Sequence, residues 1–274
     1  MKPMILSDFA VEVAAPQACT ASSLISCENL SVYYGTHKAL DGINIEIPEK
    51  RIYALMGPSG CGKTSLLYAM AGLLGQVPNA RVSGSIQFKG KDLTDVSSAQ
   101  SVRHHIGFVF QKPTPFPFSI YRNLELVIKE HGIKDNSEVR HRIESVLCRV
   151  GLWSEVKDRL HKSALALSGG QQQRLCMARA LVLQPSVLLM DEPCSALDPI
   201  SSGVIEELIS DLGRNHSVIL VTHNLAQAKR LSHDTAFFWV NGTAGVLIES
   251  GPTPHLFAHP KHELTAAYVS GARG

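Results

Sequence analysis

The chain has almost no net charge and no long apolar run. Its 274 residues include 26 Lys and Arg against 24 Asp and Glu, for a net charge of +2. This balance excludes a protein that works mainly through a strong basic field, such as a general DNA-coating protein. No stretch approaches the roughly 20 uninterrupted apolar residues that span a bilayer. Ser7, Asp8 and Glu12 interrupt the apolar N-terminus, which therefore makes a poor signal peptide.

The chain also lacks a C-x-x-C pair. Its six cysteines are scattered along the sequence: Cys19, Cys27, Cys61, Cys148, Cys176 and Cys194. In a chain of this size that distribution predicts reduced thiols and a cytosolic location. The composition is otherwise that of an ordinary globular protein, 45% apolar, which can bury a sizeable core.

Short apolar stretches bounded by turn residues predict strands. They lie at residues 43–47, 52–56, 83–88, 106–110, 187–190 and 218–221. The first and third of these alternate apolar and polar residues. The runs at 52–56, 187–190 and 218–221 are continuously apolar, which is typical of parallel strands buried on both faces.

Helical patterns lie between some of these strands. Residues 66–74 are long enough for a helix, and helical signals dominate from about residue 120 to residue 183. Residues 138–150 place Val139 and Ile143, among others, on one apolar face. Residues 1–25 lack sustained periodicity and are expected to form a mobile N-terminal extension.

A glycine-rich stretch between a strand and a helix predicts a phosphate site. The spacing G-x-x-x-x-G-K-[ST] is matched by Gly57-Pro58-Ser59-Gly60-Cys61-Gly62-Lys63-Thr64, and Ser65 follows. Glycines let backbone N–H groups turn toward phosphate oxygens, and the helix N-terminus adds a partial positive charge. Lys63 would reach the β- and γ-phosphates, and the Thr64 hydroxyl would ligate Mg²⁺. The alternative is a glycine-rich turn with an accidental Lys-Thr.

Cys61 lies inside this stretch, next to Lys63 and a helix N-terminus. Both neighbours favour the thiolate, so we expect a reactive thiol that a maleimide labels faster than Cys148 or Cys176. The alternative is a small residue that fills a turn.

Two carboxylates follow the apolar strand at 187–190. Asp191 is placed to hold Mg²⁺, directly or through water. Successive strand residues point to opposite sides, so Glu192 would instead polarise the water that attacks the γ-phosphate. The alternative is two solvated acids at a strand end.

Leu167-Ser168-Gly169-Gly170-Gln171 resembles the signature of ATP-binding cassette (ABC) ATPases. Other elements of that family occur in the same order. They are Tyr34, like the aromatic that stacks on adenine; Gln111 after a strand; Ser195-Ala196-Leu197-Asp198; and His223 after the last apolar strand. The resemblance runs from about Ser26 to the C-terminus.

The resemblance implies an α/β fold, the P-loop NTPase ABC cassette. Its core would be a mainly parallel sheet with an N-terminal antiparallel β part and an inserted helical subdomain. The implied single domain covers residues 26–274, with the sheet core at about 26–110 and 186–250. The helical subdomain would occupy about 111–185, and a C-terminal tail about 251–274.

The same resemblance implies a homodimer that hydrolyses ATP with Mg²⁺. Each subunit would present Ser168 and Gly170, with the neighbouring Gly169 and Gln171, to the ATP on the other subunit's phosphate loop. His223 would help to position the attacking water. Gln111 would serve both catalysis and Mg²⁺. Asp198 would lie at the dimer interface, unless it simply caps the helix that follows.

Three stretches resemble the ATPase subunits of bacterial phosphate importers. They are Phe110–Pro117, Leu167–Cys176 and Asp191–Ser201. That implies two transmembrane permease subunits, an extracytoplasmic phosphate-binding protein and a peripheral position on the cytoplasmic face of the inner membrane. No nucleic-acid partner is expected. Gln111–Pro117 would form a stiff apolar docking rim, or else an ordinary Pro-rich connector. The alternatives are a cassette for another small solute and a non-transport regulatory cassette.

Overall fold

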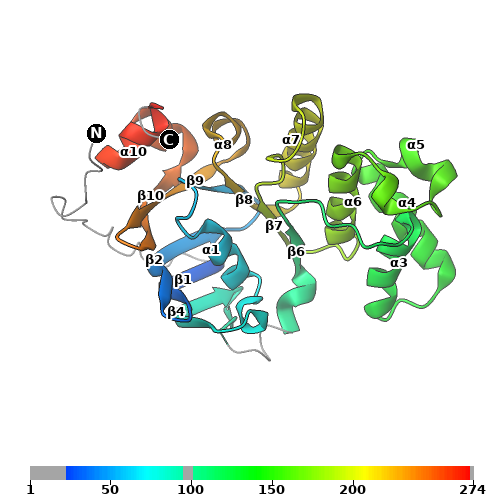
Figure 1. Cartoon of the computed structure of the whole chain (residues 1–274), viewed down its shortest axis with the longest axis horizontal. Helices are drawn as coiled ribbons and strands as arrows, with labels where there is room; N and C mark the ends of the chain where they lie inside the picture. The colour runs from blue at the N-terminus through cyan, green and yellow to red at the C-terminus, as the bar shows by residue number, and fades with distance from the viewer. Residues whose placement is uncertain (1–22, 95–100, 272–274) are drawn as a thin grey trace. The chain divides into compact units, whose positions relative to one another are not determined.

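The computed structural model describes residues 23–94 and 101–271, which form two compact units (Figure 1). The first unit lies within Met1–Arg103 and Ser217–Gly274, and the second is His104–His216. The extension expected at residues 1–25 falls outside the described residues as far as residue 22. Strand β1 begins at Ser23.

The first unit contains most of the strands. In chain order its elements are β1 (Ser23–Tyr34), β2 (His37–Pro48), β3 (Ile52–Met56), α1 (Lys63–Met70), β4 (Ala80–Phe88), β5 (Lys91–Asp92), β8 (Ser217–Thr222), α8 (Leu225–Leu231), β9 (Asp234–Asn241), β10 (Ala244–Pro252), α9 (Thr253–Ala258) and α10 (Glu263–Val269). The strands of this unit form one sheet in the order β5-β4-β1-β2-β10-β9-β3-β8.

The sheet of the first unit is mixed. The strands β1, β2, β4 and β5 pair antiparallel, whereas β3 pairs parallel with both β8 and β9. Every residue of β3 and β8 is buried, as the continuous apolar runs predict. In β2 the alternating residues Ile43, Ile45 and Ile47 are buried, whereas Glu46 is exposed. The predicted α/β class is therefore confirmed, with an antiparallel N-terminal part.

The second unit contains a group of helices and two strands. Its elements are β6 (Ile106–Val109), α3 (Ile120–Glu130), α4 (Asn136–Arg149), α5 (Trp153–Val156), α6 (Gly169–Leu181), β7 (Val187–Asp191) and α7 (Pro199–Gly213). Helices α3, α4 and α6 contact one another and are green to yellow-green in Figure 1. The apolar face expected in residues 138–150 is confirmed, because Val139 and Ile143 are fully buried in α4.

Element boundaries differ modestly from the predicted ones. The helix expected at residues 66–74 is α1, which begins at Lys63 and ends at Met70. Gly72 follows with a φ of 63°, a left-handed conformation that ends a helix and that glycine adopts at little cost. The expected strands all fall on observed strands. Within the described ranges, no helix combines the length and apolarity needed to cross a membrane.

The helix α9 packs against β9 and β10 in the first unit, and α10 packs against β10. Their side chains Leu256 and Tyr268 join Met56, Phe237 and Ile248 in one buried cluster. The ring of Tyr268 lies 5.0 Å from that of Phe237, centroid to centroid. The C-terminal helices therefore belong to the core that supports β3.

We expect Tyr268→Ala to lower the free energy of unfolding by about 3 kcal/mol, because a buried aromatic ring leaves a cavity. Urea denaturation would measure the loss. Ser270→Ala is the matched control, because Ser270 is exposed at the end of the same helix. Its effect on the free energy of unfolding should stay within about 0.5 kcal/mol. Equal effects of the two substitutions would contradict this packing.

Candidate functional site

The glycine-rich loop leaves the carboxyl end of β3, a strand of the first unit that is buried at every residue. Strand β3 pairs on one side with β8 and on the other with β9, and Met56 is paired with Thr222 and Phe237. The loop begins at the next residue, Gly57, and ends where α1 begins at Lys63. In open α/β sheets, ligands bind at this carboxyl edge.

Two glycines allow the loop to pack closely against its neighbours. A Cβ at Gly57 would lie 2.3 Å from the carbonyl oxygen of Phe238. A Cβ at Gly62 would lie 2.4 Å from Leu40 Cδ2, and Gly62 has a φ of 83°. Any other residue would clash there and would also be strained. The loop can follow this path only with glycine at both positions.

The first turn of α1 suits an anion. Gly62 occupies the N-cap position and has no side chain with which to accept the backbone N–H groups of the helix. The turn contains Lys63 and no acidic residue. The helix N-terminus therefore presents N–H groups and a partial positive charge, the arrangement that binds phosphate oxygens.

Lys63 is buried and its ammonium group is held by the loop itself. Nζ donates to the carbonyl oxygens of Gly57 at 2.8 Å and Pro58 at 2.7 Å, and it lies 3.4 Å from Cys61 Sγ. A buried ammonium needs such partners because it has lost most of its hydration. The loop thus carries a fixed positive charge on the residue expected to reach phosphate.

The expectation of a reactive Cys61 is wrong. Its side chain is fully buried, at 0% exposure, within the loop. Burial raises the pKa of the Cys61 thiol, although the charge and hydrogen bond of Lys63 act to lower it. The positive neighbours favour the thiolate, but desolvation of the buried sulfur is the larger effect. Cys61 is instead the small residue that fills the turn.

Tyr34 and His223 also belong to the first unit. The hydroxyl of Tyr34, the last residue of β1, donates to Ser65 Oγ of α1 at 3.2 Å. His223 is exposed and follows Thr222, the partner of Met56. The α8 helix begins just beyond it, with Asn224 as its N-cap. Both predicted side chains therefore lie near the ends of the phosphate loop, and their roles toward a nucleotide remain predictions.

In the second unit, strand register brings Gln111 and Glu192 together. Strands β6 and β7 are parallel, and Val109 pairs with Met190. Gln111 and Glu192 each lie two residues beyond these partners, and Gln111 Nε2 donates to Glu192 Oε2 at 3.1 Å. Asp191, the buried last residue of β7, directly precedes Glu192. The sequence predicted these residues, although not the hydrogen bond between them.

The backbone of Glu192 is held in an unusual conformation. Its φ is 42°, in the left-handed region, which costs a residue other than glycine about 1–3 kcal/mol. Its carbonyl oxygen accepts the backbone N–H of Ser195 at 3.1 Å and the Ser195 hydroxyl at 3.0 Å. These bonds hold the chain in the bend that turns the Glu192 carboxylate toward Gln111.

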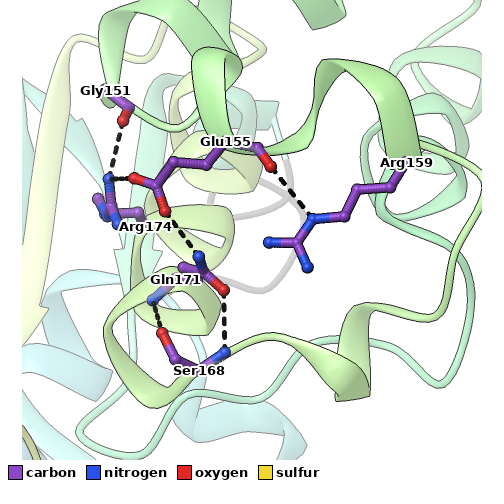
Figure 2. Close-up of polar contacts among 6 residues, drawn as sticks. All are labelled: Gly151, Glu155, Arg159, Ser168, Gln171 and Arg174. Atoms are coloured by element: carbon purple, nitrogen blue, oxygen red, sulfur yellow. Dashed lines mark hydrogen bonds and ion pairs between the residues drawn. The ribbon is translucent and has the colours of Figure 1, made fainter.

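The signature residues begin a helix with a reciprocal cap. Ser168 is the N-cap of α6, and its Oγ accepts the backbone N–H of Gln171 at 3.4 Å. Gln171 Oε1 in turn accepts the backbone N–H of Ser168 at 3.0 Å (Figure 2). This capping box fixes the start of the helix and keeps Ser168 exposed at its end.

The starts of α6 and α7 meet within the second unit. A Cβ at Gly170 would lie 2.7 Å from Ser201 Oγ in the first turn of α7. Asp198 caps that helix by accepting the N–H groups of Ile200 and Ser201, both at 3.0 Å. Hydrogen bonds led by that from the Ser201 side chain lower the pKa of Asp198. The expected capping role of Asp198 is confirmed, and its role at a dimer interface remains a prediction.

Sequence reasoning missed the residues that support these groups from a distance. Glu155, Arg174 and Gly245 are the main examples. A Cβ at Gly245 would lie 2.0 Å from the carbonyl oxygen of Cys61, so this glycine admits the phosphate loop beside β10. No local motif marks any of the three positions, because each acts through a contact between segments that are separate in sequence.

Comparison with known proteins identifies a family. The family model described as ABC transporter matches residues 40–195. The chain is 54% identical over 265 residues to phosphate import ATP-binding protein PstB 1 of Nitrosococcus oceani, covering 96% of this chain and 95% of that protein. It is 45% identical over 262 residues to PstB 2 of Listeria monocytogenes, covering 95% of each chain.

Solved structures give the same result for the fold. CbiO1 from Clostridium perfringens, part of the ABC transporter complex cbiONQ, matches with a TM-score of 0.73 and 27% identity over 92% of this chain and 95% of that one. The ATP-binding cassette MJ0796, solved as a dimer bound to ADP and Pi, matches with a TM-score of 0.71 and 27% identity. That match covers 84% of this chain and 98% of the other.

We expect a maleimide to label Cys148 before Cys61, because Cys148 is exposed and Cys61 is buried. Peptide mapping by mass spectrometry after brief labelling of the native protein would measure the order. Cys148→Ser should remove the fast-labelled peptide and leave the Cys61 peptide unchanged. Faster labelling at Cys61 would restore the reactive-thiol hypothesis.

Proposed function

Because the chain belongs to the ABC transporter family, we propose that it is the ATP-hydrolysing subunit of an importer of inorganic phosphate. The observation that carries the proposal is 54% identity, over nearly the whole chain, to a protein named for phosphate import. The site geometry supports the ATPase part, since the residues that this chemistry needs are present and ordered. A cassette for another small solute, or a regulatory cassette, would share that geometry.

The phosphate loop is proposed to bind the phosphates of ATP. The loop residues 57–62 and the N-terminus of α1 supply N–H donors, and Lys63 supplies a positive charge. Thr64 and Ser65 follow in the first turn of the helix. Tyr34, which is joined to Ser65, is proposed to stack on adenine.

The proposed ligands of Mg²⁺ are Thr64, Gln111 and Asp191. All three offer oxygen atoms, which a hard cation prefers. The Gln111 amide nitrogen bonds to Glu192, so its amide oxygen is the atom that would ligate. The described residues contain no group of three or more His, Cys, Asp or Glu able to hold a metal. Mg²⁺ does not need one, since substrate phosphates usually supply other ligands. When bound, the ion would neutralise charge on the phosphate oxygens.

Glu192 is proposed to orient the attacking water and accept its proton. Gln111 holds one carboxylate oxygen, and Ser195 holds the backbone, so the group has a defined direction. A carboxylate so fixed loses little freedom when it meets the water. The water oxygen bonds to the γ-phosphorus, and ADP leaves. His223 is proposed to contact the γ-phosphate as this happens.

Two subunits are proposed to form a head-to-tail homodimer that binds two ATP molecules. The ATP bound by one subunit would then be met by signature residues of the other subunit, namely Ser168, Gly169, Gly170 and Gln171, together with Asp198. The exposed N-terminus of α6 supports this, since it presents a hydroxyl and N–H groups. The similar cassette MJ0796 was solved as a dimer with ADP and Pi, the products of hydrolysis.

The remaining partners are proposed to be two transmembrane permease subunits and, indirectly, an extracytoplasmic phosphate-binding protein. The chain would lie peripherally on the cytoplasmic face of the membrane. The expected docking rim at residues 111–117 is flanked by exposed Phe110 and Phe118, and Leu165 is also exposed. Large apolar side chains at a surface favour a protein contact there.

We expect a strain that lacks this gene to lose high-affinity phosphate uptake, and the natural chain to restore it. Glu192→Gln should not restore it, because loss of the base costs roughly 10²- to 10⁴-fold in hydrolysis. Uptake of radiolabelled phosphate would be measured beside ATP binding, which the variant should keep. Restored uptake of a different solute, with phosphate uptake unchanged, would contradict the substrate.

A mixed dimer tests the shared sites. Ser168→Arg in one chain and Lys63→Ala in the other place both lesions on the same composite site and leave the second site intact. We expect the mixed dimer to retain residual hydrolysis, whereas each parental homodimer should have none. Turnover would be measured on tagged, co-purified heterodimers. Full activity of Ser168→Arg homodimers would contradict the shared arrangement.

A further inference from the structure

Glu155 links α5 to the start of the signature helix within the second unit. The side chain of Glu155 accepts Gln171 Nε2 at 2.6 Å through Oε2 and Arg174 Nη1 at 2.8 Å through Oε1 (Figure 2). Each carboxylate oxygen therefore has its own donor. Burial raises the pKa of Glu155, but the hydrogen bonds from Arg174 and Gln171 and the nearby arginine charges together outweigh it, so the pKa lies below its usual range.

Neighbouring bonds hold Glu155 in place. Arg174 Nη1 also donates to the carbonyl oxygen of Gly151 at 2.8 Å, and Arg159 Nε donates to the backbone oxygen of Glu155 at 3.1 Å. Arg174 is largely buried, with 13% of its side chain exposed, whereas the Glu155 side chain is 37% exposed. The carboxylate is thus a fixed acceptor at the edge of the unit.

An ionised carboxylate can only accept hydrogen bonds, and this determines how the Gln171 amide is turned. The amide must direct Nε2 toward Glu155, so Oε1 is directed toward the backbone N–H of Ser168. A rotated amide would place its oxygen against the carboxylate and its nitrogen against an N–H donor. Glu155 therefore selects the amide orientation that closes the capping box.

The capping box in turn determines what Ser168 can offer. Its Oγ accepts the N–H of Gln171, so the hydroxyl hydrogen can be donated to an external acceptor. Both polar ends of the Gln171 side chain are used inside the unit, one on Ser168 and one on Glu155. Gln171 in this arrangement acts on a nucleotide through Ser168.

We propose that Glu155 is a positioning residue for the trans nucleotide contact, acting through Gln171 to orient Ser168 and the N-terminus of α6. This inference rests on the proposed function, in which Ser168 meets the γ-phosphate bound by the other subunit. Glu155 acts only through Gln171, and it preserves the donor geometry that closure of the dimer requires.

The test uses the Glu192→Gln chain, in which hydrolysis is slow and an ATP-bound dimer should accumulate. Glu155→Ala in that chain should weaken ATP-dependent dimerisation about tenfold, because a charge-assisted hydrogen bond is lost. Binding of a fluorescent ATP analogue to the isolated subunit should change less than about twofold, since that ATP lies on the phosphate loop. Sedimentation and fluorescence titration would measure the two quantities.

Glu138→Ala is the matched control. Glu138 is a helical glutamate of the same unit whose side chain is 44% exposed and pairs with Arg142 at 2.6 Å within α4. Its loss should leave dimerisation and ATP binding unchanged. Thermal unfolding would show whether both variants fold. We expect melting temperatures close to that of the parent chain, because surface ion pairs contribute little to stability.

A swapped pair separates positioning from general support. Gln171→Glu alone would set two carboxylates against each other and should weaken dimerisation more than Glu155→Ala does. Adding Glu155→Gln restores a donor facing an acceptor, and an acidic residue still closes the capping box. The double variant should therefore regain most of the lost dimerisation. A general loss of support would not be repaired in this way.

The outcomes distinguish the two proposals. If the Glu192→Gln chain forms no ATP-dependent dimer, the proposed function fails and this inference falls with it. If that dimer forms and Glu155→Ala leaves its affinity unchanged, only the role of Glu155 is overturned. The same holds if the swapped pair dimerises no better than Gln171→Glu alone.

Discussion

The path of the phosphate loop depends on the burial of β3. A strand enclosed by parallel neighbours on both sides cannot shift its register without exposing its apolar residues, so the point where it ends is fixed. Gly57 leaves that point between Phe238 and the start of α1. Lys63 is buried where the loop ends. Its ammonium group has therefore lost most of its water and bonds to the carbonyl oxygens of Gly57 and Pro58 instead. A buried apolar strand thus creates a fixed positive site at its end.

The second unit uses the same principle with different groups. Register between β6 and β7 places Gln111 beside Glu192, and a strained backbone turns the carboxylate toward the amide. The signature helix is positioned by polar contacts instead, from Glu155 through Gln171 to Ser168. Apolar strands therefore set where the reacting groups lie, and hydrogen bonds set which way they point.

The sequence predicted well those features whose cause is local. Strand β3 and the glycine spacing after it occur in one short segment, so the loop and its lysine could be located without a structure. Cys61 was misjudged because its loop packs against segments far away in the chain, among them β10, where Gly245 lets the Cys61 carbonyl oxygen approach closely. Glu155 was missed for a related reason: its partner Gln171 belongs to a different helix, and no periodicity links them.

The contact between Gly170 and Ser201 makes these two positions interdependent in evolution. A methyl group at residue 170 would overlap the serine side chain, so alanine is tolerated there only if residue 201 becomes smaller or α7 moves. Movement of α7 would carry its cap Asp198 with it. A residue larger than glycine at position 170 should therefore occur in homologous chains only together with a smaller residue at position 201 or a shifted α7.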